Sequence, residues 1–260
     1  MSAFALPALP ALPALPMLAA WQWALGAACA FFVGVAKTGV PGLGIFVVPL
    51  MVLAVGDARQ SAGWLLPLLS TADVFAVIYY RRHAQAWRLF SLAPSVLAGM
   101  VAGAFALGGS EPLLRRVIGG IVLAMIVLHL VRKRRVQGEA APADGVVQAA
   151  GYGVVAGFAT VVANAAGPVM NAYLLAKRLP KEELIATGAW FFLVINLTKV
   201  PVYAGRGLMS GRSLVFDLVL APAVVLGALC GRQIFGRIPQ RAFELVVLVL
   251  TAAAAVLLVS

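Results

Sequence analysis

The sequence predicts an all-α, polytopic membrane protein built from two related halves. Hydrophobic residues make up 63% of the chain and charged residues only 11%, whereas a soluble domain carries about 25% charged residues. Long stretches contain no charged side chain, among them residues 1–36 and 145–176. Because about 20 apolar residues are needed to cross the hydrocarbon core of a bilayer, these stretches predict membrane-spanning helices.

Apolar segments and one polar linker define the organisation of the chain. Ten hydrophobic segments occur, at about 19–36, 42–56, 61–80, 91–108, 113–131, 145–163, 167–177, 184–204, 214–231 and 241–259. The polar stretch from Arg132 to Asp144 separates them into two sets of five. We therefore expect a proline-rich N-terminal arm (1–18), a first membrane repeat (19–131), a basic cytoplasmic linker (132–144) and a second membrane repeat (145–260).

The two halves share a pattern in their fourth segments. Residues 93–103 and 221–231 both read A-P-x-V-x-x-G-x-x-x-G, and glycines four residues apart on one helix face allow close helix approach. Five segments is an odd number, so the second half must be inverted relative to the first. We therefore expect two inverted five-segment repeats.

Basic residues predict the orientation. Twenty Lys and Arg residues against nine acidic ones give a net charge of +11. The bases lie mostly in short connections, which favours topology and contact with anionic lipid over nucleic-acid binding. With the linker cytoplasmic, thirteen bases face the cytoplasm and five, Arg59, Arg115, Arg116, Arg206 and Arg212, face outside, in agreement with the positive-inside rule.

A helix-breaking stretch precedes the second segment of each half. Residues 37–44 read KTGVPGLG, and residues 164–168 read NAAGP. The segments that follow, 42–56 and 167–177, are short for a membrane crossing. Two arrangements fit: thin or tilted spans, or re-entrant hairpins with tips near mid-membrane. Only the hairpins place Lys37 and Asn164 near the midplane.

These breaks are the candidate substrate site. A lysine beside the free N–H groups of a helix start forms an anion site, and two such starts facing each other form a pseudo-symmetric cradle. The alternative is that Lys37 reaches the interface and the glycines only pack helices. The candidate substrate-binding residues are Lys37, Thr38, Gly39, Pro41, Gly42, Gly44, Asn164, Gly167, Pro168 and Asn171.

Two further charges lie inside apolar segments. Asp73 and Lys199 belong to the third segments of their halves, and intramembrane charges usually pair or line a pathway. We assign them to coupling or gating. Asp73 fits either a proton carrier or the counter-ion of Lys37 or Lys199, and the alternative for both is a structural ion pair near an interface.

Other kinds of chemistry have no basis in the sequence. Cys29 and Cys230 have no metal or redox spacing, and His83 and His129 are too far apart to predict a metal site. Nucleotide-binding, metalloprotease and serine-hydrolase motifs are absent from the sequence. We therefore predict no enzymatic activity, cofactor or metal, and two alternatives to a transporter stay open: a membrane assembly factor and a passive anion channel.

Several motifs together resemble the TauE/SafE family of sulfite-exporter-like permeases, over about residues 20–259. They are Gly34 to Gly44 continuing through Pro49-Leu50, Asp57 to Gly63 followed by Leu66-Pro67 and Asp73, Tyr80 to His83 with Trp87, and Gly157 to Pro168. The resemblance implies secondary transport, without ATP, of small anions such as sulfite, organosulfonates or related acids, in a bacterial inner membrane. The resemblance does not specify whether the protein forms a homo-oligomer.

Two positions depart from the family pattern. Thr38 stands where family members often have glycine, and residues 164–167 read NAAG in place of a run of glycines. Because both changes alter the shape of the expected site, the resemblance does not identify sulfite as the substrate.

Overall fold

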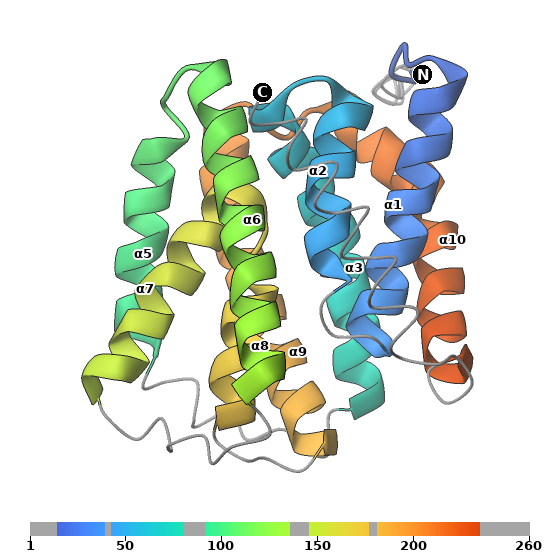
Figure 1. Cartoon of the computed structure of the whole chain (residues 1–260). Helices are drawn as coiled ribbons and strands as arrows, with labels where there is room; N and C mark the ends of the chain where they lie inside the picture. Colours follow the sequence, from blue (N-terminus) through green and yellow to red (C-terminus); the bar gives the residue numbers. More distant parts are fainter. Residues whose placement is uncertain (1–14, 40–42, 81–91, 136–145, 177–180, 235–260) are drawn as a thin grey trace, which may run out of the picture.

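A computed structural model describes residues 15–39, 43–80, 92–135, 146–176 and 181–234, and confirms the all-α prediction for these residues (Figure 1). The first half forms α1 (Ala20–Thr38), α2 (Gly44–Val55), α3 (Ala58–Tyr80), α5 (Ala93–Ala106) and α6 (Glu111–Arg135). The second forms α7 (Val146–Ala163), α8 (Gly167–Ala176), α9 (Lys181–Gly205) and α10 (Gly211–Ile234). The predicted segment 241–259 and most of the N-terminal arm lie outside the described residues.

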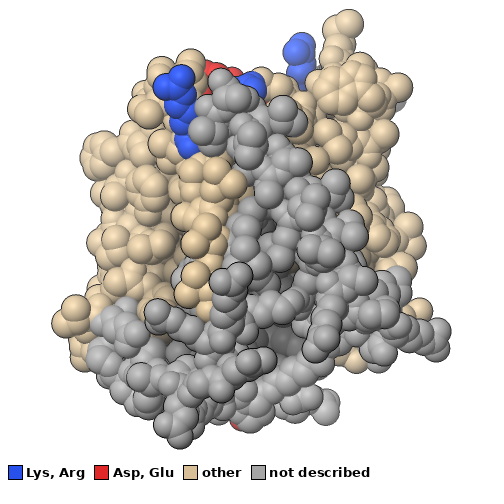
Figure 2. Space-filling view, viewed as in Figure 1, with Lys and Arg blue, Asp and Glu red and all other residues tan. Residues whose placement is uncertain are grey.

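Apolar side chains cover the flank of the bundle. Within the described ranges, two helices are long and apolar enough to cross a membrane, Ala58–Tyr80 and Gly211–Gly231, and shorter apolar helices accompany them. Large hydrophobic side chains point outward, including Phe105 and Leu218, which are 77% and 73% exposed. On the face shown in Figure 2, the visible described charged side chains lie at the ends of the bundle, and the described part of its flank carries no charged side chain.

Two close helix pairs form opposite sides of the bundle: α1 with α10, and α5 with α7 (Figure 1). A Cβ atom on Gly227 of α10 would lie 2.0 Å from the carbonyl oxygen of Phe31 in α1. A Cβ on Gly34 of α1 would lie 2.1 Å from the carbonyl oxygen of Val224. These two helices therefore touch backbone to backbone.

The second pair has the same contacts. A Cβ on Gly99 of α5 would lie 2.1 Å from the carbonyl oxygen of Val154 in α7, and a Cβ on Gly157 would lie 2.1 Å from the carbonyl oxygen of Val96. The close helix approach predicted from the repeated glycine pattern is therefore confirmed. In both cases the fourth helix of one half packs against the first helix of the other.

Helices α1 and α2 form an antiparallel hairpin. The side-chain amide of Gln22, in the first turn of α1, donates to the carbonyl of Ala54 at the end of α2 at 2.7 Å. Helix α1 has 19 residues, whereas α2 has 12 and α8 has 10. At 1.5 Å per residue, α2 and α8 are about 18 and 15 Å long, well short of a bilayer core of about 30 Å.

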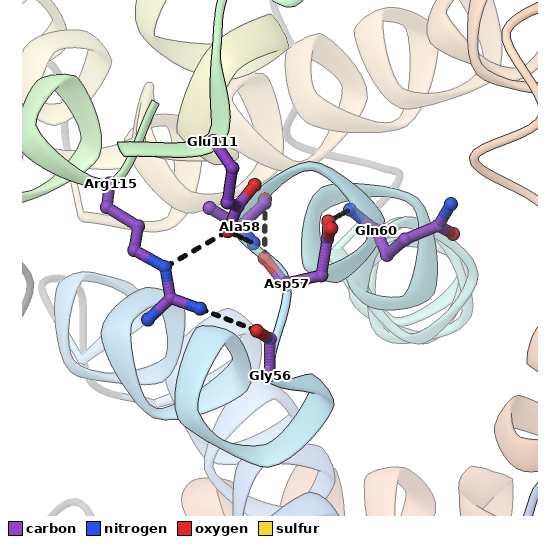
Figure 3. Close-up of polar contacts among 7 residues, drawn as sticks. Gly56, Asp57, Ala58, Gln60, Glu111 and Arg115 are labelled. Atoms are coloured by element: carbon purple, nitrogen blue, oxygen red, sulfur yellow. Dashed lines mark hydrogen bonds and ion pairs between the residues drawn. The ribbon is translucent and has the colours of Figure 1, made fainter. Parts of the chain in front are cut away.

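The turn between α2 and α3 is fixed by α6 (Figure 3). Gly56 ends α2 with φ +83°, and its carbonyl accepts from Arg115 at 2.5 Å. Glu111 accepts the N–H of Ala58 at 2.7 Å and pairs with Arg115 at 3.0 Å. Asp57 accepts the N–H of Gln60 at 2.6 Å. Side-chain oxygens thus satisfy free N–H groups at the start of α3 and anchor its first turn.

Candidate functional site

A buried polar cluster lies between α1, α3, α7 and α9, inside an otherwise apolar core. Asp73 and Lys199 have no exposed surface, and Thr160 and Asn196 are 2% and 3% exposed. Polar groups buried in this way are costly unless they are paired. We call the set formed by Lys37, Asp73, Thr160, Asn164, Asn196 and Lys199 the central cluster.

Lys37 and Asp73 form the ion pair of the central cluster. The ammonium nitrogen of Lys37 lies 2.7 Å from Oδ1 of Asp73, and their side chains are 16% and 0% exposed. The same ammonium lies 4.0 Å from the ring centre of Phe192, close enough for a cation–π interaction. Oδ2 of Asp73 accepts the side-chain amide of Asn196 at 2.6 Å. Of the counter-ions considered for Asp73, the structure thus selects Lys37.

Lys199 is held by oxygen atoms of α7 and of the break that follows it. Its ammonium donates to Oδ1 of Asn164 at 2.5 Å, to the hydroxyl of Thr160 at 3.0 Å and to the carbonyl of Thr160 at 3.2 Å. Within the described residues it forms no ion pair. The acceptors that the described residues offer to the buried Lys199 amine are therefore uncharged oxygens.

Asn164 connects the second break, residues 164–168, to α3 and α9. Its φ of +50° lies in the left-handed region, which Asn tolerates better than most residues, and it ends α7. Its side-chain amide donates to the carbonyl of Ala62 in α3 at 2.9 Å while its oxygen accepts from Lys199 in α9. The break before α8 is thereby fixed against α3 and α9.

The central cluster lies inside the bundle, nearer the last residue of α3 than its first. Helices α3 and α9 run in opposite directions (Figure 1), and a Cβ on Gly63 near the start of α3 would touch Leu208, which follows the end of α9. Asp73 lies fifteen residues beyond the first residue of α3 and seven before its last, or about 22 and 10 Å along the helix. Asn196 lies fifteen residues beyond the first residue of α9 and nine before its last.

Thr38 and Gly39 of the predicted substrate site face α10. The Thr38 hydroxyl donates to the carbonyls of Ala228 and Gly34, at 2.8 and 3.1 Å. A Cβ on Gly39 would lie 2.3 Å from the carbonyl oxygen of Gly231. In this conformation both residues pack helices, because the side of α1 that carries them is the side that α10 covers.

The two helix starts have room beside them. A Cβ on Gly44, the first residue of α2, or on Gly167, the first residue of α8, would meet no atom of the described residues within 4 Å. Helices α2 and α8 also contact each other. Pro41 and Gly42 lie outside the described residues; Pro168 and Asn171 belong to α8, but their side chains are likewise not described.

Two uncharged members of the central cluster, Thr160 and Asn196, were not identified from the sequence. Asn196 lies one helical turn before Lys199, and Thr160 one turn before Asn164, so each shares a helix face with a residue that was identified. That spacing was the available signal. Neither an amide nor a hydroxyl is conspicuous in an apolar segment, and Phe192 resembles any core aromatic residue.

Comparison with known protein families gives a match over most of the chain. The family described as sulfite exporter TauE/SafE matches residues 26–258, nearly the whole chain. Searches of curated proteins and of solved structures gave no significant match. The apolar helices and this family together indicate a membrane protein of the transporter class. The chain belongs to the sulfite exporter TauE/SafE family.

Proposed function

We propose that the protein is a secondary transporter of small anions in a bacterial inner membrane, with sulfite and organosulfonates as the substrate class. One observation carries the proposal: the central cluster contains two lysines and one carboxylate. A buried charge requires a partner or a strong dipole environment. A small anion supplies the negative charge that the described protein groups lack.

The substrate site in this proposal lies between Lys37 and the starts of α2 and α8. Lys37 is partly exposed, whereas Asp73 and Lys199 are enclosed. Gly44 and Gly167 leave open space at the two helix starts, where N–H groups without helical partners favour an anion. These features support a site that binds the anionic group through one ammonium and backbone N–H donors.

Inverted repeats are part of the same proposal. Three residues of the first half have counterparts in similar surroundings in the second half, always at the same distance along the sequence. The pairs are Gly34 and Gly157, Gly44 and Gly167, and Asp73 and Asn196. Helices α1 and α7 run in opposite directions in Figure 1. These relations support two inverted halves that rock about the Asp73–Asn196 contact and open the site to each side in turn.

The test is anion exchange in proteoliposomes that contain the purified protein. Radiolabelled sulfite, methanesulfonate, isethionate and acetate are exchanged against the same unlabelled anion inside. We expect exchange of at least one sulfur anion, reduced at least tenfold in Lys37→Gln and unchanged in Arg212→Gln, a charge at the exposed start of α10. Absence of exchange for the whole panel contradicts the transporter proposal and favours an assembly factor.

A second measurement separates a transporter from a passive channel. A labelled anion outside should accumulate transiently against its gradient when the vesicles are preloaded with a high concentration of the unlabelled anion. A channel gives only equilibration, because it does not couple the movement of one anion to that of another.

A further inference from the structure

The two oxygens of the Asp73 carboxylate are held differently. Oδ1 contacts the ammonium of Lys37 at 2.7 Å, and Oδ2 accepts the amide N–H of Asn196 at 2.6 Å. The carboxylate is fully buried, so these neighbours replace its hydration. Lys37 supplies the compensating charge, and Asn196 supplies only a dipole.

An anion that binds Lys37 competes with Asp73 for it. The Lys37 side chain is 16% exposed and the Asp73 side chain is not exposed at all, so an anion reaches the ammonium first. Lys199 is enclosed by Thr160 and Asn164, and within the described residues the ion pair of Asp73 is formed by Lys37 and not by Lys199. Lys199 therefore does not replace Lys37 as the counter-ion.

Protonation of Asp73 removes the cost of this competition for Lys37. Without it, anion binding leaves a buried carboxylate that has lost its cation and has a second anion nearby, and both effects are unfavourable. Asn196 suits both forms of Asp73, because an amide donates to a carboxylate through Nδ2 and, after rotation, accepts from a carboxylic acid through Oδ1. With one anion and one proton added, the net charge of the central cluster is unchanged for a monovalent anion.

We propose that Asp73 couples anion transport to protons: each anion bound at Lys37 is accompanied by one proton, which binds an oxygen of the Asp73 carboxylate. Anion and proton then cross together, and both are released when Lys37 returns to Asp73. This inference rests on the proposed function and specifies its coupling ion.

Other ionisable groups lie on the helices packed against α3. Helix α2 has none, and α6 places Glu111 and Arg115 beside the first turn of α3, far from Asp73. The remaining described ones are Cys29 and Lys37 of α1, Arg116 of α6, Tyr152 of α7, Glu183, Lys199 and Tyr203 of α9, and Arg212, Asp217 and Cys230 of α10. Asp217 is the closest analogue, because it is also a buried carboxylate, 6% exposed.

The test measures proton movement in proteoliposomes with an internal pH dye, at zero membrane potential. Methanesulfonate is the probe, because it stays fully ionised at neutral pH and carries no proton itself. If only isethionate is exchanged, it replaces methanesulfonate. If only sulfite is exchanged, it is assayed at alkaline pH as the dianion, and the loss of lumen acidification in Asp73→Asn is then the deciding result, because entry of bisulfite would also acidify the lumen. Acetate is not used because it crosses membranes as the free acid.

For the wild-type protein we expect an inward anion gradient to acidify the vesicle lumen. In the reverse experiment, a pH difference of one unit, acidic outside, should accumulate a monovalent anion about tenfold, as equal free energies in the two gradients require. Asp73→Asn should retain exchange but lose both proton uptake and accumulation. Asp217→Asn, the matched control, should retain all three.

The outcomes separate the two proposals. Exchange without proton uptake in the wild-type protein overturns the coupling and leaves the transporter proposal intact. Proton uptake that persists in Asp73→Asn, or that is lost only in Asp217→Asn, overturns the assignment to Asp73. Absence of exchange with every sulfur anion of the panel overturns both. If Asp73→Asn does not fold, as judged by size-exclusion chromatography, the wild-type measurement alone decides whether protons are coupled.

Discussion

Replacement of Lys37 by Gln tests the central ion pair directly. It leaves the fully buried Asp73 carboxylate with the Asn196 amide as its described hydrogen-bond donor. Removal of one partner from a buried ion pair costs about 3–5 kcal/mol, because the remaining charge is uncompensated. Since Lys37 is partly exposed, we expect about 3 kcal/mol. At about 2–4 °C per kcal/mol for a chain of this size, the melting temperature should fall by about 6–12 °C.

A second substitution shows whether the loss of stability comes from the uncompensated Asp73 carboxylate. Asp73→Asn in the Lys37→Gln background removes the carboxylate and should recover most of the stability, with a coupling energy of about 2–3 kcal/mol between the two sites. Thermal unfolding in detergent, followed by the fluorescence of the five tryptophans, gives all four melting temperatures. Additive losses in the double variant would refute the reasoning, because they would mean that the two charges do not compensate each other.

Three further predictions concern packing, the site and the α2–α3 turn. Gly34→Ala and Gly157→Ala should each lower stability by about 1–3 kcal/mol, measured by the same unfolding assay, because the added methyl meets a facing backbone carbonyl. Gly44→Ala and Gly167→Ala should leave the melting temperature unchanged but slow anion exchange, because the added methyl enters open space at the helix starts. Glu111→Ala should lower stability by about 1–2 kcal/mol, by removing the acceptor for the first turn of α3 and the partner of Arg115, while exchange at low temperature is retained.

The anion panel provides one more stability test, grounded in the competition at Lys37. If Asp73 and the anion compete for the same ammonium, methanesulfonate should raise the melting temperature of Asp73→Asn more than that of the wild-type protein. Equal shifts would mean that the anion does not bind at Lys37.

Much of the fold was predictable because the membrane constrains it strongly. Long apolar segments have to be helical where no water can satisfy the backbone, and helix-breaking residues mark where they stop. Helices α2 and α8 begin at Gly44 and Gly167, the glycines of the two predicted breaks. The repeated glycine pattern of α5 and α10 also predicted close packing. Glycine has no side chain, so it allows close approach of a neighbouring helix whichever helix that is.

The identity of those neighbours was not predictable. The pattern does not specify that α10 packs on α1, so the contact of Thr38 with α10 could not be foreseen, and the assignment of Thr38 to the substrate site stays a prediction. The charged members of the central cluster were found because a charge in an apolar segment is conspicuous. Which lysine pairs with Asp73 depends on tertiary geometry, and the sequence left both Lys37 and Lys199 as candidates.

The difference between Asp73 and Asn196 gives the proposed repeats a functional reason to be unequal. Two carboxylates in contact there would repel each other and retain a proton even in the empty protein. Two amides would leave Lys37 without a counter-ion. One of each gives a carboxylate that Lys37 neutralises when the site is empty and a proton neutralises when an anion is bound. Because Asp73 is buried at the contact between the two proposed halves, a single residue can exchange its proton with whichever side is open.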